Sequence, residues 1–553
     1  MEFDQVLSLL GQLGKYQVQL FFAIALPTMS ASLLNLSAVF IMAAPDFRCA
    51  IPGLENDTYT VQDDHHQSLI NATIPRGETC KIYSNTSGVN RTTQGCSAWV
   101  YDTSVFLSTA VTDFNLVCEY KILSSVVTMA FMFGMLVGGF VCGRISDKFG
   151  RLTVIVVGSV LQGISGLAFA FSVNIYMLIG CRFLMGFFGL GIYASCFVYV
   201  LEIVGPDRRT AAGIGQSFYH SLANVLITLP AYFIRDWVYL SITLSSVSFL
   251  VIPYWWLFPE SPRWQIAKGR KKEAVKFIRK AAKTNRKIIP EKIFEELDLA
   301  ISDDQPKGSL LDVLKSGVML RRTAIVCLNW GAIAMGYYGL SLNSGNMVGD
   351  IFVNFLISGA IEIPAGIFAL VALDRIGRRG VHVFCMILGG LGCLATIPVV
   401  IFADSSLSSW LLIVLSNVGK FGLSAGFKVM YVYTAELYHT TVRSAAIGIN
   451  SISARMFSMA APYIADLGVL IGGNFSQVLP QIVFGSAGLI AGIFAVFLPE
   501  TLNTVLPKTL EDAIALGNKK KHCNNEAHFE AANPAFVKDE DVNVEMKEMD
   551  TKY

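Results

Sequence analysis

The sequence predicts an all-α membrane protein with twelve transmembrane helices, arranged as two pseudo-symmetric six-helix bundles. Apolar residues make up 53% of the 553 positions and charged residues only 15%, too few for the surface of a water-soluble protein of this length. Twelve apolar runs reach the roughly 20 residues needed to cross a bilayer. A short charged motif occurs twice, with Asp374 following Asp147 by 227 residues. A repeat on this scale indicates two copies of one helical unit.

The predicted spans follow one another along the chain, interrupted by two long polar segments. Residues 16–258 form the N-terminal bundle and residues 323–498 the C-terminal bundle. The remaining parts are an N-terminal segment (1–15), a linker with short helices (259–322) and a tail (499–553), which is expected to be largely disordered because it is rich in Lys, Asn, Asp and Glu. The approximate spans are 16–42, 122–143, 152–173, 175–202, 211–233, 237–258, 323–341, 350–373, 381–403, 409–437, 444–471 and 478–498.

Charge predicts the orientation. Residues 259–322 hold 16 Lys and Arg against nine Asp and Glu, whereas residues 43–121 hold five against nine. The positive-inside rule therefore places the linker, both termini and the two charged motifs in the cytoplasm, and residues 43–121 outside a plasma membrane. Since a charged, glycine-containing turn cannot lie in hydrocarbon, residues 143–151 and 374–379 are predicted to be loops at the membrane face.

The predicted extracellular loop carries two marks of an oxidising, lumenal environment. Four sequons predict N-glycosylation, and four cysteines predict two disulfides with three possible pairings. The run Asp63-Asp64-His65-His66 is interpreted as a solvated surface rather than a metal site, because no second ligand cluster accompanies it. The sequon asparagines are Asn56, Asn71, Asn85 and Asn90, and the cysteines are Cys49, Cys80, Cys96 and Cys118.

A second repeat predicts a gate. Glu202 and Arg209 recur as Glu436 and Arg443, both 234 residues later. Together with the charged motifs they would form cytoplasmic ion pairs that break when the two halves open inward. The alternative is a set of independent helix-end charges. The predicted gating residues are Asp147, Arg151, Glu202, Arg209, Asp374, Arg378, Glu436 and Arg443.

Several motifs together resemble the solute carrier 22 family of organic cation, anion and carnitine transporters, and its insect organic cation transporter-like branch most. They are the motif from Gly143 to Arg151, Pro-Glu-Ser-Pro-Arg-Trp at 259–264, Pro-Glu-Thr-Leu at 499–502, Ser108 to Cys118 and Tyr433 to Tyr438. The major facilitator fold and transport by alternating access are what this resemblance implies.

Two ionisable residues inside predicted helices bear on the substrate, because each is costly at the bilayer centre, by about 2.5–3.5 kcal/mol. Glu362 is similar to a family acid that faces the cavity and attracts cationic groups. Arg455 stands where simple cation transporters of the family carry an acid, and where anion and carnitine transporters carry Arg. The two residues would together suit a zwitterion, or they could pair with each other. Glu362 could also be only a structural partner of a buried base.

Further positions match cavity-lining positions of the family. Lys428 matches no pattern and could snorkel or pair with Glu436, and if both helix-ten lysines faced the cavity, anionic substrates would be favoured. Aromatic faces attract ammonium groups by about 0.5–2 kcal/mol. The predicted substrate-binding residues are Tyr193, Gln216, Tyr337, Tyr338, Glu362, Lys420, Tyr431 and Arg455.

The predicted function is polyspecific transport of small organic cations or carnitine-like zwitterions. The alternatives are an organic anion exchanger and a non-transporting membrane sensor. No assembled nucleophile, base and orienting acid predicts an enzyme, and no cofactor, metal or nucleic acid is expected. Concentrating a zwitterion would need a coupled ion, Na⁺ or H⁺, because the membrane potential does no work on a neutral solute.

Overall fold

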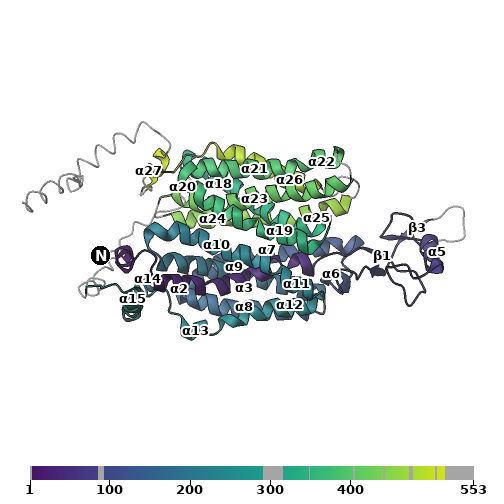
Figure 1. The fold of residues 1–553 in the computed structure, drawn as a ribbon, viewed down its shortest axis with the longest axis horizontal. Helices are drawn as coiled ribbons and strands as arrows, with labels where there is room; N and C mark the ends of the chain where they lie inside the picture. The colour runs from purple at the N-terminus through teal and green to yellow at the C-terminus, as the bar shows by residue number, and fades with distance from the viewer. Residues whose placement is uncertain are drawn as a thin grey trace, which may run out of the picture.

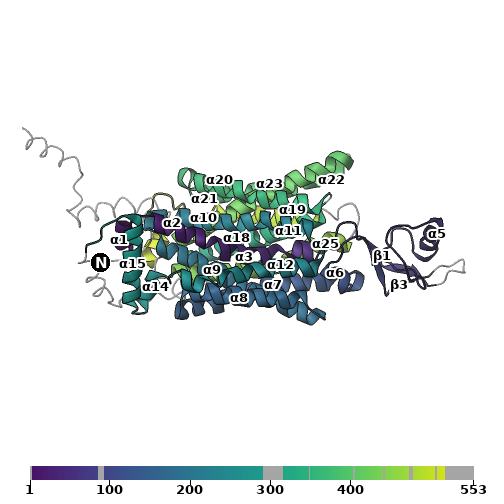
Figure 2. The same cartoon turned by 60° about the horizontal axis from the view of Figure 1, so that its bottom comes forward.

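The computed structural model describes residues 3–84, 92–290, 315–347, 349–402, 405–439, 442–471, 478–504, 507 and 509–516. The helices run side by side along one long axis (Figure 1), and the C-terminal half, in green, lies against the N-terminal half, in purple to teal. At one end a small domain containing β1, β3 and α5 projects beyond the helices in both views (Figure 2). We call this end the loop end, and the opposite end, which carries Gly150 and Gly377, the turn end.

The N-terminal half supplies six spans. The first contains three short helices and the sixth contains two α-helices joined by a 3-10 turn. In chain order the elements are α2 (Lys15–Ala23), α3 (Ala25–Leu36), α4 (Ala38–Ile41), α7 (Lys121–Phe149), α8 (Arg151–Ala170), α9 (Ile175–Ile203), α10 (Arg209–Leu226), α11 (Thr228–Phe233), α12 (Trp237–Ser246), η3 (Val247–Val251) and α13 (Tyr254–Leu257).

The C-terminal half supplies six more. Its elements are α18 (Gly317–Asn343), α19 (Ile351–Ala360), α20 (Glu362–Ile376), α21 (Arg378–Leu394), α22 (Thr396–Phe402), α23 (Ser405–Leu437), α24 (Arg443–Ser458), α25 (Ala461–Ile471) and α26 (Leu479–Ala495). Among the described residues, nine helical segments are long and apolar enough to cross a membrane. The other three spans are α10 with α11, α24 with α25, and the shorter α26. The twelve-span fold is thereby confirmed.

Proline explains where spans break into two helices. The breaks at Ile24, Ile227, Ile361 and Ala395 each lie three residues before a proline, at positions 27, 230, 364 and 398. A proline removes the hydrogen bond to the carbonyl four residues earlier and clashes with it, so the helix bends there. One of these bends comes directly before Glu362, which is the first residue of α20.

The two charged motifs are not loops, contrary to the prediction. Helix α7 continues through Phe149 and α20 through Ile376, so nearly all of each motif is helical. The chain turns at a single glycine in each half, Gly150 with φ 109° and Gly377 with φ 102°. Only glycine adopts such angles without strain. The charged residues extend the helices beyond the apolar stretch, where water solvates their side chains.

Helices also form before and after the two bundles. Helices α1 (Phe3–Leu10), α14 (Pro262–Ala267) and α15 (Lys271–Asn285) lie at the turn end (Figures 1 and 2). The described part of the predicted disordered tail contains a helix, α27 (Leu510–Ala515), whose last carbonyls accept hydrogen bonds from Arg322. Residues 291–314 of the linker and 517–553 of the tail lie outside the described residues.

The two halves meet mainly through two pairs of spans. Helix α10 packs against α19 and α20, and α7 packs against α24 and α25. Within the N-terminal half, Gly134 and Gly138 allow α7 to approach α9, since a Cβ at either position would lie 2.0–2.1 Å from a carbonyl oxygen of α9.

The small domain at the loop end, which lies between α4 and α7 in the chain and which we call the loop domain, is held together by two disulfides. Its two antiparallel sheets pair β1 (Phe47–Cys49) with β4 (Trp99–Tyr101) and β2 (Lys81–Tyr83) with β3 (Thr93–Gly95), and α5 (Asp64–Thr73) packs beside them. The disulfides join Cys49 to Cys96 and Cys80 to Cys118, which selects one of the three pairings left open by the sequence.

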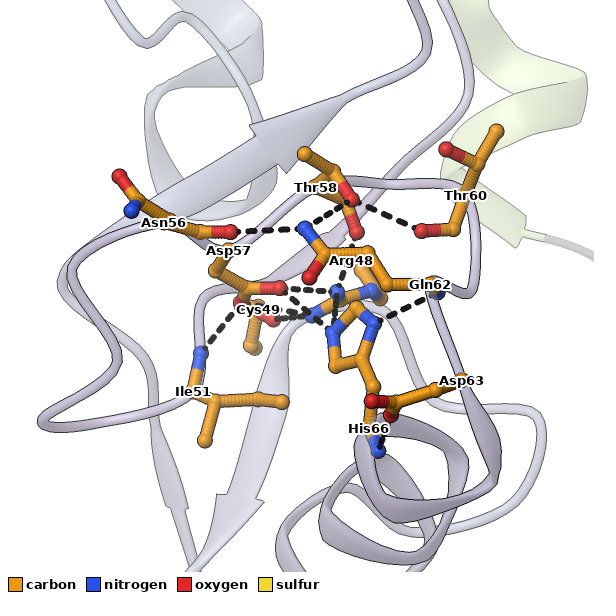
Figure 3. Close-up of polar contacts among 10 residues, drawn as sticks. All are labelled: Arg48, Cys49, Ile51, Asn56, Asp57, Thr58, Thr60, Gln62, Asp63 and His66. Atoms are coloured by element: carbon orange, nitrogen blue, oxygen red, sulfur yellow. Dashed lines mark hydrogen bonds and ion pairs between the residues drawn. The ribbon is translucent and has the colours of Figure 1, made fainter.

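A buried polar cluster lies within this domain (Figure 3). Asp57 accepts hydrogen bonds from Arg48 and from the Ile51 amide at 2.8 Å, and it lies 3.0 Å from His66 Nε2. The Gln62 amide donates to His66 Nδ1 at 3.1 Å. His66 is only 3% exposed, so the prediction that residues 63–66 form a solvated surface is wrong for this residue. Asp63 instead caps α5 by accepting from the His66 amide.

Candidate substrate site

A cavity lies between the two halves, lined by residues from the middle of their helices. Helices α3, α7, α9 and α10 line it from the N-terminal half, and α18, α20, α23 and α24 from the C-terminal half. A cavity shared by both halves has walls that separate when the halves rock, which is the geometry that alternating access requires.

Glu362 is the acid of this cavity. The residue is 1% exposed, and its carboxylate accepts hydrogen bonds from Tyr337 OH at 2.9 Å, Ser221 Oγ at 3.1 Å and Asn224 Nδ2 at 3.3 Å. Ser221 and Asn224 belong to α10, in the other half. The carboxylate is therefore held by donors from both halves.

A lysine neutralises this acid. Lys420 Nζ lies 3.2 Å from Glu362 Oε1 and donates to Ser341 and Ser358 at 2.9 and 2.8 Å. Both charged side chains are 2% exposed. Lys420 lies behind the cavity wall rather than in it. Glu362 is thus both a cavity-lining acid and the structural partner of a buried base. From the sequence alone these two roles were alternatives.

Lys428 lines the cavity and is held by backbone. Its Nζ donates to the carbonyl oxygen of Glu362 at 2.8 Å and lies 5.9 Å from the centre of the Phe218 ring. It does not pair with Glu436, because that carboxylate is bound to Arg378. The ammonium of Lys428 therefore adds a positive charge to the cavity wall.

Arg455 lies across the cavity on α24 and does not pair with Glu362. Its Nη1 donates to Tyr338 OH at 2.8 Å, and the buried Nε has no hydrogen-bond partner among the described residues. A guanidinium with unused donors facing a cavity is suited to binding a carboxylate. With Glu362 neutralised by Lys420, the wall carries an excess of positive charge from Lys428 and Arg455.

Aromatic rings form much of the remaining wall. Tyr337 stacks on Phe427 with ring centres 5.8 Å apart, and Tyr431 packs edge-on against Trp330 at 4.5 Å. Tyr193 and Tyr338 also line the cavity. Rings of this kind offer faces to ammonium and alkyl groups.

The structure brings six of the eight predicted substrate-binding residues into the cavity wall. Gln216 is 0% exposed and donates to the Tyr193 carbonyl at 3.3 Å, so it lies behind the wall as Lys420 does. The wall residues are Tyr193, Tyr337, Tyr338, Glu362, Tyr431 and Arg455.

Sequence reasoning missed a polar stripe on α10. Ser217, His220, Ser221 and Asn224 are spaced three or four residues apart, so they share one face of the helix. Ser217, His220 and Ser221 line the cavity, and Asn224 binds Glu362. Polar residues at helical spacing inside an otherwise apolar span were the available signal.

The charged motif of the N-terminal half forms an ion-pair group at the turn end. Arg151 joins Asp147 and Glu202, at 3.0 Å each. Arg209 pairs with Asp4 of α1, which also binds Arg263. Although burial by itself raises the pKa of Asp4, the two guanidinium groups hold that pKa below its usual value. The sequence did not indicate a role for Asp4.

The C-terminal half repeats this arrangement. Arg378 lies 3.6 Å from Asp374 and 3.0 Å from Glu436. In each half the helix after the glycine turn is capped by an acid from the Pro-Glu motif. Glu260 accepts from the amides of residues 151 and 152, and Glu500 from those of residues 378 and 379. Carboxylates stabilise helix N-termini in this position.

The two ends of the molecule differ in how the halves are joined. At the turn end, none of the ion pairs named above joins the N-terminal bundle to the C-terminal bundle. At the loop end, Phe40 of α4 stacks on Phe352 of α19 with ring centres 5.6 Å apart, and Ser125 donates to Asp466 at 2.7 Å. The halves are therefore in direct contact across the loop end.

Two six-span halves around one shared cavity define a secondary transporter of the major facilitator class, not an enzyme. The sugar (and other) transporter family matches residues 78–512. The chain belongs to this family and, within it, to the solute carrier 22 organic cation and carnitine transporters. The predicted resemblance is confirmed.

The relatives match nearly the whole chain. The organic cation transporter protein of Drosophila melanogaster is 35% identical over 538 residues, covering 94% of this chain and 96% of that protein. Organic cation/carnitine transporter 2 of Homo sapiens is 33% identical, with 94% and 95% coverage. The proton:xylose symporter XylE of E. coli shares the fold, with a TM-score of 0.59 at 18% identity, covering 90% of this chain and 99% of that one.

Proposed function

We propose that the chain carries small organic cations or carnitine-like zwitterions across the plasma membrane by alternating access. The observation that carries this proposal is that a hydrogen-bonded acid, Glu362, and a guanidinium with an unused donor, Arg455, face each other across one aromatic cavity without pairing. An ammonium group would bind near Glu362 and the rings, and a carboxylate near Arg455. The names of the relatives, which include organic cation and carnitine transporters, support the same substrates.

We infer the membrane orientation from the loop domain and the linker. Two disulfides require an oxidising compartment, and the sequon residues Asn56 and Asn71 are exposed on this domain. Asn85 and Asn90 lie outside the described residues. The loop end would then face outside, with both termini and the basic linker in the cytoplasm. Glycosylation at these four sites belongs to this proposal.

The ion pairs at the turn end are proposed to form the gate. With the loop end closed, each group stays within its own half. Opening of the loop end would bring the two halves together at the turn end, where exposed Asp147 and Asp374 could find partners across the interface. Arg443, another of the predicted gating residues, would act in the same closed gate.

A second candidate is organic anion exchange. It is favoured by the excess positive charge that Lys428 and Arg455 give to the wall once Lys420 has neutralised Glu362. The membrane potential distinguishes the candidates, because an inside-negative potential contributes about 2.3 kcal/mol per 100 mV to a cation and opposes an anion.

Uptake by oocytes expressing the chain tests the proposal with labelled tetraethylammonium, carnitine and p-aminohippurate. We expect uptake of one of the first two, and for tetraethylammonium a fall on depolarisation. Glu362→Gln should weaken ammonium substrates selectively, whereas Ser30→Ala, a buried change on α3 outside the cavity, should leave uptake unchanged. Uptake of p-aminohippurate alone would establish the second candidate, and uptake of none of the three would contradict transport.

A further inference from the structure

His220 joins the two halves through a chain of hydrogen bonds. Its Nδ1 lies 2.7 Å from Ser32 Oγ on α3, and its Nε2 lies 3.1 Å from Tyr337 OH on α18. Tyr337 in turn donates to Glu362 at 2.9 Å. The chain thus connects an imidazole of the N-terminal half to the paired acid of the C-terminal half.

The hydrogen bonds from Ser32 through His220 and Tyr337 to Glu362 can accommodate one additional proton. Tyr337 uses its single proton on Glu362, so Nε2 of His220 must donate to the tyrosine oxygen. Ser32 Oγ lies 2.7 Å from the Thr28 carbonyl as well as from Nδ1. If the Ser32 proton points to Thr28, Nδ1 must donate and the ring is an imidazolium. If the proton points to Nδ1, the ring is neutral.

The imidazole can therefore gain or lose a proton through rotation of one serine hydroxyl, with all heavy atoms in place. Both protonation states of His220 thus satisfy its hydrogen bonds, as a site that binds and releases a proton requires. Whether each ring nitrogen of His220 carries a proton follows from whether a donor or an acceptor faces it.

The substrate charge acts directly on this site. The charged groups around His220 are Glu362, Lys428, Lys420 and Arg455, on α20, α23 and α24, and the Tyr193 ring of α9 lies 6.1 Å away. Glu362 is the one group of this set that favours an imidazolium. A substrate ammonium that approaches Glu362 competes for the same negative charge, and a substrate carboxylate near Arg455 reduces the repulsion by the bases.

We propose that His220 is a proton-binding site linked to substrate charge, so that an organic cation displaces its proton and moves in exchange for it. This inference rests on the proposed function, and it selects H⁺ over Na⁺ as the coupled ion. Each cation that enters the cavity releases one proton to the side from which the cation came, and His220 takes up a new proton on the side where the cation is released. The only bond that breaks is the N–H bond at His220 Nδ1, whose proton passes to water, and the Ser32 hydroxyl then donates to Nδ1.

Purified protein in liposomes, with the membrane potential clamped to zero, provides the test. We expect an acidic lumen (about pH 6, with about pH 7.5 outside) to accelerate tetraethylammonium uptake by roughly fivefold or more over equal pH on both sides. His220→Gln, which keeps two polar partners but cannot take up a proton, should transport at one rate under both conditions. Transport by the wild type that ignores the gradient, or equal stimulation of the variant, would overturn the proposal.

A second pair of variants tests the proposal even if His220→Gln does not fold. Ser32→Ala removes the rotating hydroxyl and should reduce the stimulation by the gradient, whereas Ser30→Ala on the same helix should not. An equal response of these two variants would contradict the proposed hydrogen-bond chain. Absence of tetraethylammonium transport by the wild type under every gradient would instead contradict the proposed function, so the two failures are distinguishable.

Discussion

The Lys420 ammonium lies 3.2 Å from the Glu362 carboxylate, and the two come from different helices of the same half. Each is 2% exposed, so neither charge is solvated by bulk water. Removing one member of such a pair leaves an uncompensated buried charge, at a cost of roughly 3–5 kcal/mol. An entering substrate cation could supply the missing compensation.

Lys420→Gln should therefore increase the preference for cations. We expect the KM for tetraethylammonium to fall about tenfold, because the substrate replaces the lost ammonium beside Glu362. The empty variant should be less thermally stable than the wild type, and tetraethylammonium should raise its melting temperature more. Lys420→Arg keeps the charge and serves as the control. Equal KM values in wild type and glutamine variant would show that the cation does not approach Glu362.

Arg455→Lys should separate carboxylate recognition from charge alone. A lysine keeps the positive charge but loses the planar pair of donors that suits a carboxylate. We expect the KM for carnitine to rise about tenfold, equivalent to about 1.4 kcal/mol, while that for tetraethylammonium changes little. Initial rates of uptake measure both values. A matched loss for the two substrates would indicate that Arg455 supports the fold through Tyr338 instead.

A cysteine pair at positions 125 and 466 should report closure of the loop end. Ser125 donates to Asp466 at 2.7 Å, so the two side chains are adjacent in this state. We expect oxidation of Ser125→Cys with Asp466→Cys to cross-link the halves and stop uptake, with recovery after reduction. Each single variant is the control. Continued transport with the bond formed would contradict rocking of the halves at this end.

Asp57 should make the loop domain sensitive to strong acid. Burial alone raises the pKa of this carboxyl, but hydrogen bonds from Arg48, the Ile51 amide and His66 hold it below its usual value of 3.8. Since the folded pKa is depressed, the stability contributed by the ionised group is present above about pH 4 and is lost as the pH falls through the folded pKa.

Asp57→Asn should remove this contribution at neutral pH, because Arg48 would be left buried without its partner. We expect the loop domain to lose roughly 3–5 kcal/mol, measured as faster proteolysis of residues 43–120 and lower cell-surface expression. The change keeps the sequon Asn56-x-Thr58, so glycosylation at Asn56 does not confound the result. Unchanged protease resistance would show that the cluster in Figure 3 is dispensable.

Several parts of the site could be read from the chain because each depends on local chemistry. Glu362 and Arg455 were identifiable since a charge inside an apolar span is costly wherever it points. His220 carries a weaker signal, because a neutral imidazole costs less in an apolar span than a full charge, and its place in the cavity depends on which face of α10 meets the other helices. Gln216 was predicted at the wall but lies behind it, because one step along a helix rotates a side chain by about 100°.

The length and apolar composition of a span, and the excess of Lys and Arg in a loop, are properties of each segment by itself. The sequence alone therefore predicts twelve spans, two halves and their orientation. The pairing of Glu362 with Lys420, the free donor of Arg455 and the positive excess of the cavity depend on which helices meet. Lys420 is 58 residues from Glu362 along the chain. Electrostatic interaction depends on distance in space, and only the packed helices set that distance.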